Sequence, residues 1–343
     1  MSRRHLAVAF ALAAASTAHA APVPVTEAGT TSIPALDIPS TPLMSREGNA
    51  SRVEHILTER SLSGRPTNEF NAVLFGPRLE RTKAAYPVKT HDATMGGVPV
   101  RIYEPPSGAP QAPVLLNVHG GGFVGCFIEC GGLESIPIAA LTGLRVISID
   151  YRLAPKGQFP EASQDVAAVY REVLKTTPAT KVGLYGCSAG GLLTAQSLAW
   201  FQAEGLPTPA AAGVFCAGGD PGMGGDSRIL GMLLGDGEAP AIGASGGPRL
   251  GYMRSAKADD PRAFPAADPA TLGRFPPTLV VVGTRDFALS SAVSLHSRLV
   301  TAGVDARLHA WEGGRHAFFY DSRVPEAREA YAVITKFFTD RLR

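Results

Sequence analysis

The chain has 343 residues, of which 45% are hydrophobic and 18% are charged, a composition that excludes a disordered or low-complexity polypeptide. A chain of this length can bury a substantial core, in one large domain or two small ones. Its formal net charge is only +2, which excludes the strongly basic balance that is typical of nucleic-acid-binding proteins.

Residues 1–20 have the composition of a secretory signal peptide. Arg3 and Arg4 are basic, residues 6–15 are uniformly apolar, and Ala18-His19-Ala20 fits a cleavage site. We therefore expect an exported protein, periplasmic or secreted, with twin-arginine export as an alternative to the general route. Removal of this segment leaves 32 − 2 = 30 basic residues against 30 acidic ones. No later segment is long and apolar enough to predict stable membrane insertion.

The stretch at 21–86 precedes the predicted core. Residues 21–45 are rich in Pro, Thr and Ala without periodicity, so we expect an extended lead-in. Residues 46–86 have apolar side chains at helical spacing, interrupted by Ser-Gly-Arg-Pro at 63–66. This pattern predicts two short helices that could cover part of the core.

From residue 87 onward, strand and helix patterns alternate. Strand-like runs at 88–93 and 98–103 flank Met95-Gly96-Gly97, which predicts a β-hairpin. Further strands are predicted at 114–118, 145–149, 182–185, 211–215, 279–282 and 306–311, and helices at 163–175, 192–203, 290–302 and 325–342. Such alternation predicts an α/β domain over 87–343, with a mostly parallel central sheet and helices on both faces.

One interval between predicted strands is too long for a simple connection. Residues 217–275 are rich in Gly, Pro, Ala and Asp, with apolar clusters at 229–230 and 232–234. Long loops without structure of their own are uncommon in compact domains. We therefore expect an insertion that covers the carboxyl edge of the sheet.

A serine lies between a predicted strand and a predicted helix. The apolar run at 182–185 ends in Gly186-Cys187-Ser188-Ala189-Gly190, and a helical pattern follows directly. Gly-x-Ser-x-Gly in this context is typical of a nucleophile elbow, a turn too tight for side chains beside the serine. The helix N-terminus beneath the hydroxyl favours developing negative charge, so Ser188 is the predicted nucleophile.

A glycine-rich turn follows the strand at 114–118. In His119-Gly120-Gly121-Gly122 the glycines allow successive backbone N–H groups to turn toward one bound oxygen. Acyl transfer requires such donors, because the carbonyl oxygen of the substrate becomes an oxyanion. We assign the predicted oxyanion hole to the N–H groups of Gly121, Gly122 and Ala189.

The general base is expected to be a histidine on a loop at the carboxyl edge of the sheet. Seven of the eight histidines lie in the signal peptide, before the core, in the glycine turn, in a helix or in a strand: His5, His19, His55, His91, His119, His296 and His309. His316 follows the strand at 306–311 in a loop, and is the predicted base.

The carboxylate that orients this base is expected to follow the preceding strand. Asp286 comes directly after the strand at 279–282 and is the predicted acid, with Asp220 and Asp305 as rivals. The chain order Ser188, Asp286, His316 is the order found in hydrolases with a strand–elbow–helix nucleophile. Such a triad requires neither a metal nor an organic cofactor.

The chain has four cysteines, at 126, 130, 187 and 216. Their spacing does not match a zinc site, and export makes disulfides possible. Cys187 and Cys216 both follow strands that we expect to lie side by side, so we hypothesise a disulfide between them. Buried unpaired cysteines are the alternative, because spacing alone does not determine pairing.

Four ordered motifs carry a resemblance to a known family: His119-Gly-Gly-Gly-Phe123, Tyr151-Arg-Leu-Ala-Pro155, Gly186-x-Ser188-Ala-Gly-Gly191 and Pro276-Pro-Thr278. From residue 98 onward the chain resembles the bacterial hormone-sensitive-lipase-like esterases. The resemblance implies an α/β-hydrolase core, a cap built from the N-terminal helices and the insertion, and hydrolysis of carboxylic esters, usually of short acyl chains. The chain departs from the family at Cys187, where the family commonly has Asp.

The predicted function is serine carboxylesterase activity on a small-molecule ester, through an acyl-enzyme and without a cofactor. Lactone hydrolysis by the same triad is one alternative; a peptidase and a non-catalytic ligand-binding member of the fold are others. Candidate pocket residues, each with core or cap packing as the alternative, are Phe123, Phe127, Met223, Met232, Leu233, Phe287 and Phe318. The oligomeric state and the natural substrate have no signal in the sequence.

Overall fold

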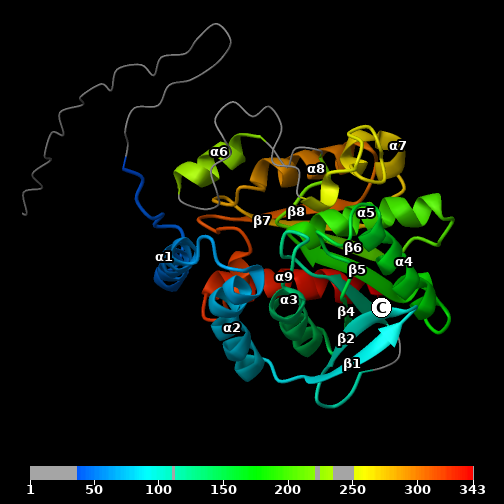
Figure 1. Ribbon diagram of the computed structural model, residues 1–343, viewed down its shortest axis with the longest axis horizontal. Helices are drawn as coiled ribbons and strands as arrows, with labels where there is room; N and C mark the ends of the chain where they lie inside the picture. The colour runs from blue at the N-terminus through cyan, green and yellow to red at the C-terminus, as the bar shows by residue number, and fades with distance from the viewer. Residues whose placement is uncertain (1–36, 110–112, 221–224, 235–250, 343) are drawn as a thin grey trace, which may run out of the picture. The chain divides into compact units, whose positions relative to one another are not determined.

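The computed structural model describes residues 37–109, 113–220, 225–234 and 251–342, so the predicted signal peptide at 1–20 lies outside the described residues. The described strands form one eight-stranded sheet in the order β1-β2-β4-β3-β5-β6-β7-β8 (Figure 1). Their bounds are β1 Lys89–Met95, β2 Val98–Glu104, β3 Val114–Val118, β4 Arg145–Ile149, β5 Val182–Cys187, β6 Ala211–Phe215, β7 Thr278–Gly283 and β8 Ala306–Trp311.

The sheet is mostly parallel, as the sequence predicts. β1 and β2 form the expected hairpin, in which Met95 pairs with Val98. β2 also runs antiparallel to β4, and every later pairing is parallel. β3, β5, β6 and β7 are buried along their whole length, which explains their continuous apolar runs.

Helices cover both faces of the sheet. They are α1 Arg46–Ser61, α2 Thr67–Ala85, α3 Phe127–Thr142, α4 Glu161–Leu174, α5 Ala189–Ala203, α6 Asp226–Leu233, α7 Pro269–Leu272, α8 Leu289–Thr301 and α9 Pro325–Leu342. Successive side chains of a strand point to opposite faces. Leu116 accordingly packs in a core cluster with residues of α4, α5 and α8, whereas Leu115 packs with residues of α3 and α9. Figure 1 shows these helices on the two sides of the sheet.

Helix α3 has no counterpart among the predicted elements. It joins β3 to β4 and contains Gly131, Gly132 and Pro137, which interrupt a helical pattern in the sequence. Nearly all of its length is buried, and it packs against α2 and α9. Tertiary packing therefore stabilises a helix for which local propensity gives little support.

The two predicted N-terminal helices are present as α1 and α2, with a break between Ser61 and Thr67. The predicted insertion contains α6, α7 and two short 3₁₀ turns, Gly251–Met253 and Pro265–Ala267. Part of it belongs to the core, because Tyr252 is fully buried and stacks on Phe123 with ring centroids 4.4 Å apart. Residues 221–224 and 235–250 of the insertion lie outside the described residues.

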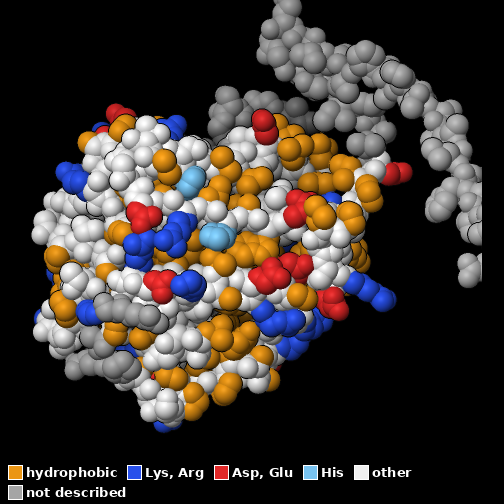
Figure 2. All heavy atoms as spheres, turned by 180° about the vertical axis from the view of Figure 1, so that it is seen from behind, with side chains coloured by type: hydrophobic (Ala, Val, Ile, Leu, Met, Phe, Trp, Pro, Cys, Tyr) orange, Lys and Arg blue, Asp and Glu red, His pale blue; other side chains and the backbone are white. Residues whose placement is uncertain are grey.

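The surface mixes charged and apolar side chains. Figure 2 shows basic and acidic groups interspersed with hydrophobic ones over the face seen from behind. This pattern agrees with the near balance of basic and acidic residues in the chain. None of the described helices has the length and apolar character needed to cross a membrane.

Candidate active site

Ser188 lies in the turn between β5 and α5, where the elbow was predicted. Its backbone has φ 60° and ψ −123°, values that residues other than glycine rarely adopt. Ser188 N donates to Phe215 O of β6 at 2.8 Å, and Leu192 N donates to Ser188 O inside α5 at 3.1 Å. Bonds to the neighbouring strand and to the following helix thereby hold the strained turn in place.

The glycines beside Ser188 let the turn pack against the sheet. A Cβ atom on Gly186 or Gly190 would overlap the carbonyl oxygen of Val118 in β3. A Cβ atom on Gly191 would lie 2.7 Å from Phe215 O of β6. Any larger residue would have to push α5 away from these strands, which is the physical reason for Gly-x-Ser-x-Gly here.

The glycine turn after β3 also requires its glycines. Gly121 has φ 109° and Gly122 has φ 64°, both in the left-handed region that favours glycine. Both residues line the same cavity as Ser188. Ala189, the third predicted donor, is the first residue of α5. The assignment of these three N–H groups to an oxyanion hole remains a prediction.

His316 and Asp286 are in direct contact. His316 Nδ1 lies 2.8 Å from Asp286 Oδ1, across a separation of 30 residues. Asp286 is buried, and its Oδ1 also accepts from Ala288 N at 2.8 Å. A carboxylate can only accept, so we assign the imidazole proton to Nδ1, which leaves Nε2 with a lone pair. Phe287 stacks on the ring with centroids 4.2 Å apart.

Neither rival acid is bonded to His316. Asp220 Oδ2 lies 3.5 Å from Ser291 Oγ, and Asp305 is hydrogen-bonded to Arg341. Among the other histidines, His119 is fully buried, and burial lowers its pKa to about 4. It is therefore neutral at ordinary pH and packs as a structural residue.

Ser188 and His316 line one cavity of about 850 Å³, a volume within the usual range for small-molecule sites. Residues 59–75 of α1, α2 and their connection supply part of its lining. The aromatic lining residues there are Phe70 and Phe75, and the candidates Phe123, Phe127, Phe287 and Phe318 do not line this cavity. Phe123 and Phe318 pack in the buried core, which was the alternative for them. Leu233 is exposed, while Met223 and the Met232 side chain lie outside the described residues.

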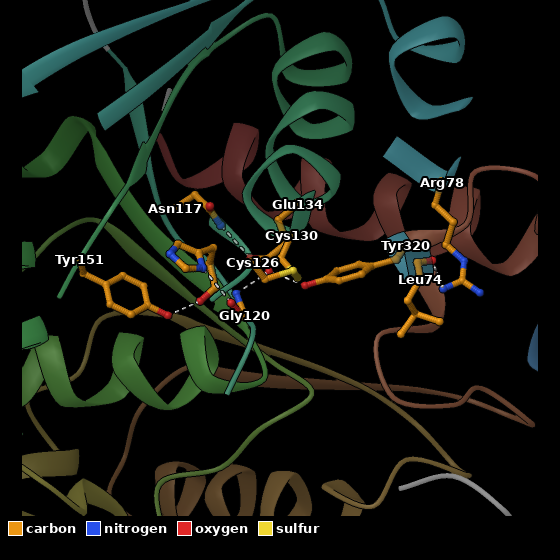
Figure 3. Close-up of a disulfide and its surroundings, with 10 residues drawn as sticks. Leu74, Arg78, Asn117, Gly120, Cys126, Cys130, Glu134, Tyr151 and Tyr320 are labelled. Atoms are coloured by element: carbon orange, nitrogen blue, oxygen red, sulfur yellow. Dashed lines mark hydrogen bonds between the residues drawn. A yellow bond between two sulfur atoms is a disulfide. The ribbon is translucent and has the colours of Figure 1, made fainter. Parts of the chain in front are cut away.

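A buried carboxyl group that the sequence did not single out lies behind the glycine turn. Glu134 of α3 accepts from Gly120 N at 2.9 Å, from Asn117 Nδ2 at 2.7 Å, and from the Tyr320 hydroxyl (Figure 3). The one sequence signal was an acidic residue inside an apolar stretch, Leu133-Glu134-Ser135-Ile136. A charged residue in such a stretch is rarely fully buried without a specific partner.

The hypothesised disulfide between Cys187 and Cys216 was wrong. Both cysteines are buried free thiols, and the disulfide joins Cys126 to Cys130. Cys126 caps α3, so residues four apart lie on the same side of its first turn. The expectation that β5 and β6 are neighbours was correct, because Cys187 pairs with Phe215 in the parallel register. Adjacent strands therefore did not imply a bond between the cysteines.

Cys216, Asp286 and His316 each offer one potential ligand atom, and the three atoms lie within 4.8 Å of one another. A thiolate is the form of cysteine that binds metals. Burial raises the pKa of Cys216 well above its ordinary value, which disfavours that form. Asp286 and His316 already satisfy each other, so the donor set suits a proton relay better than a metal centre.

The sequence matches a protein-family model over more than half of the chain. Residues 115–320 match the model described as the alpha/beta hydrolase fold. Among solved structures, an esterase from the bacterial hormone-sensitive lipase family has a TM-score of 0.72 and 27% identity. The similarity covers 86% of this chain and 99% of that one.

Two relatives show how far the similarity in sequence extends. An acetyl-hydrolase of Streptomyces hygroscopicus is 29% identical over 231 residues, 65% of this chain and 74% of that protein. A versiconal hemiacetal acetate esterase of Emericella nidulans is 38% identical over 120 residues. The second alignment covers 35% of this chain and 41% of that esterase, so it spans less than half of the relative.

Proposed function

Because the chain belongs to the alpha/beta hydrolase family that matches residues 115–320, and its motifs are those of the hormone-sensitive-lipase-like branch, we propose that it is a serine carboxylesterase. Ser188 is the nucleophile, His316 the general base and Asp286 the residue that orients the base. The observation that carries this proposal is the 2.8 Å contact between His316 Nδ1 and Asp286 Oδ1, in a histidine that lines one cavity with Ser188.

The reaction proceeds in two acyl-transfer steps. Nε2 of His316 accepts the Ser188 proton as Oγ attacks the ester carbonyl, and the protonated imidazole is stabilised by Asp286. The C–O bond to the alcohol then breaks, and His316 returns the proton to the departing oxygen. Water, activated by the same imidazole, cleaves the acyl-enzyme and regenerates Ser188.

Backbone amides stabilise the charge that develops on the carbonyl oxygen. Gly121 and Gly122 line the cavity, and Ala189 N is at the positive end of α5. Removing one such donor from a serine hydrolase typically costs about 10²–10³ in kcat. These donors are backbone groups, so the positive φ of the two glycines matters more than any side chain.

We propose esters with short acyl groups as the substrate class. The names of the Streptomyces and Emericella relatives both specify release of an acetyl group or cleavage of an acetate. The cavity has both polar and apolar lining groups, which suits a small ester with a polar alcohol portion. Lactones undergo the same chemistry, so they belong in the same test.

The test is a series of nitrophenyl esters of increasing acyl length, with lactones added, on the wild type and two variants. We expect turnover to be fastest on the shorter esters and S188A to lower kcat by about 10⁵–10⁶. Ser197→Ala is the matched control, because Ser197 is a buried serine within α5 and its Oγ has no hydrogen-bond partner among the described residues. Ester turnover by S188A at the wild-type rate would refute the assignment.

We further propose that the protein is exported, with residues 1–20 removed. The composition of that segment supports export, and so does the Cys126–Cys130 disulfide, because disulfides persist in oxidising compartments. N-terminal sequencing of the protein recovered from the periplasm or medium should begin at Ala21. Recovery of the uncleaved chain from the cytosol alone would contradict this proposal.

A further inference from the structure

The carboxyl group of Glu134 lies where three segments of the proposed active site meet. Gly120 immediately precedes Gly121 and Gly122, and its N–H donates to Glu134 Oε1 at 2.9 Å. Tyr320, which follows His316 in the same loop region and lines the cavity, donates its hydroxyl to the same oxygen. Figure 3 shows the two groups approaching the carboxyl group from different elements.

The third segment is the strand end that leads to the nucleophile. A Cβ on Gly120 would lie 3.0 Å from Cys187 O, 3.2 Å from Tyr320 Oη and 3.3 Å from Glu134 Oε1. Backbone hydrogen bonding from Cys187 also favours the charged form of Glu134. The glycine turn, the residue before Ser188 and the tyrosine after His316 therefore pack around one carboxyl group.

The other carboxyl oxygen is fixed from the sheet. Glu134 Oε2 accepts from Asn117 Nδ2 at 2.7 Å, and Asn117 Oδ1 accepts from Ser148 Oγ at 2.7 Å. These bonds run from β4 through β3 to α3, all of them buried. Glu134 therefore has little freedom to move relative to the strand that carries the glycine turn.

The described groups that hydrogen-bond this carboxyl group are all uncharged. The titratable groups that sense its charge are Tyr103 of β2, Tyr151 after β4, Tyr185 and Cys187 of β5, Tyr320, and Tyr331 of α9. Burial raises the pKa of every one of them, so all are neutral at ordinary pH. For Glu134, burial raises the pKa to about 7, although the hydrogen bonds from Tyr320, Gly120 and Asn117 oppose this shift.

We propose that Glu134 is a positioning residue for the reaction, whose carboxylate holds the glycine turn, the strand end before Ser188 and the loop of His316 in their reactive arrangement. This inference rests on the proposed function. Glu134 does not line the cavity with the reacting groups; it acts through Gly120 and Tyr320. Small displacements of groups around a reacting carbonyl carry large losses in rate, up to about 10² for 1 Å.

The ionised form is the one that fits the donors. The two carboxylate oxygens accept from three donors: Oε1 from Gly120 N and the Tyr320 hydroxyl, and Oε2 from Asn117 Nδ2. A proton on Oε2 would face the Asn117 amide, and a proton on Oε1 would require the Tyr320 hydroxyl to turn from donor to acceptor. Protonation of Glu134 therefore loosens the arrangement as pH falls. The acid limb of kcat against pH then includes the protonation of Glu134.

Glu134→Gln is the discriminating variant, because it keeps the shape and removes the titration. The amide oxygen of the new side chain can accept from Gly120 and Tyr320. Its NH₂ can donate to Asn117 Oδ1 once the side-chain amide of Asn117 has turned by 180°. Asn117 can then donate to the hydroxyl of Ser148, so no buried group loses its partner. The variant is therefore expected to fold.

We expect E134Q to lower kcat for a short nitrophenyl ester by about 10- to 100-fold near pH 8, with KM within about twofold of the wild type. Its acid limb should be less steep than that of the wild type, because one proton has been removed from the titration. An E134Q variant with the wild-type kcat and the wild-type profile would overturn the inference.

Tyr320→Phe and Tyr331→Phe form a matched pair that tests the inference even if E134Q does not fold. Tyr331 is also a buried tyrosine that bonds α3, donating to Leu133 O at 2.7 Å, but it does not reach the carboxyl group. Y320F removes a donor that favours ionised Glu134, so its acid limb should move to higher pH and its kcat should fall. Y331F should retain the wild-type kcat and the wild-type position of the acid limb.

The outcomes separate this inference from the proposed function. If the wild type hydrolyses esters and Y320F behaves as Y331F does, Glu134 is not a positioning residue and the esterase assignment survives. If the wild type turns over no ester or lactone, the proposed function fails and this inference fails with it. Reduced kcat with a flatter acid limb in E134Q supports both.

Discussion

The imidazole of His316 and the carboxylate of Asp286 lie in contact, at 2.8 Å, although 30 residues separate them in the chain. β7 and β8 pair in parallel, which brings the loops after both strands to the same edge of the sheet. Ala288 N holds the same carboxylate oxygen from the start of α8. The position of the base is thus fixed by sheet topology and a backbone hydrogen bond together.

Asp286→Asn should lower kcat by about 10⁴ and leave KM little changed. An amide can donate to Nδ1, which favours the wrong tautomer and removes the negative charge that stabilises the imidazolium. Steady-state kinetics on a short nitrophenyl ester measures this loss. Asp220→Asn is the matched control, because the rival acid contacts Ser291 at 3.5 Å instead of the imidazole. Equal losses in both variants would contradict the assignment of the acid.

Asp321→Asn should lower the free energy of unfolding by about 3–5 kcal/mol, because it breaks a buried charge cluster. Asp321 is fully buried, accepts from Ser51 Oγ at 2.8 Å and from Arg323 Nη2 at 2.7 Å, and lies 4.0 Å from Arg78 Nε. Denaturant unfolding measures the change. Asp92→Asn, which removes an exposed pair with Arg101, is the control and should have a much smaller effect.

The same variant should also change how the stability of the protein depends on pH. Burial alone would raise the pKa of Asp321, but hydrogen bonds from Arg323 and Ser51 outweigh it and hold that pKa below the ordinary range. A lowered pKa contributes stability above the ordinary Asp range, and that stability is lost as pH falls toward the folded value. D321N should lack this acid-side loss. An identical loss in both proteins would exclude Asp321 as its source.

Glu134 should make the wild type less stable, relative to E134Q, as pH rises, because the cost of burying the carboxylate exceeds the stabilisation from the hydrogen bonds that position it. Burial raises its folded pKa to about 7 from an ordinary value of 4.5, so its stabilising contribution is complete below about pH 4.5. This contribution to the free energy of unfolding amounts to about 3 kcal/mol and is lost progressively up to about pH 7. Denaturant unfolding of both proteins at several pH values measures the difference. A difference that does not vary with pH would contradict the raised pKa.

Thiol counting tests the cysteine arrangement. The denatured, unreduced protein from an oxidising compartment should have two reactive thiols, on Cys187 and Cys216, and four after reduction. Alkylation followed by peptide mapping locates them. A mapped bond between Cys187 and Cys216 would restore the hypothesis that the structure overturned.

Local patterns were sufficient for the strands and for the segments that surround Ser188. β3, β4, β6 and β8 have the predicted bounds, because β3, β4 and β6 are short, mainly apolar runs and β8 alternates apolar and polar side chains. The elbow was predictable because Gly186 and Gly190 are needed for close packing on β3, and that need is visible as a motif. His316 was found by elimination, and its contact with Asp286 agrees with the predicted chain order.

Features that depend on distant partners could not be predicted in this way. α3 is a helix because its faces are buried against α2 and α9, whereas Gly131, Gly132 and Pro137 argue against a helix locally. Glu134 is bonded to Tyr320 across 186 residues, and neither residue belongs to a motif. The cysteine pairing failed for a related reason, since strand adjacency does not specify how two side chains point.

The most direct test of the central claim is covalent labelling with an organophosphorus inhibitor, followed by peptide mapping. We expect about one label per chain, on Ser188, with ester turnover lost in proportion to labelling. His316→Ala should label far more slowly, because the serine then lacks its base. A label on another residue, or full loss of turnover with Ser188 unmodified, would contradict the account.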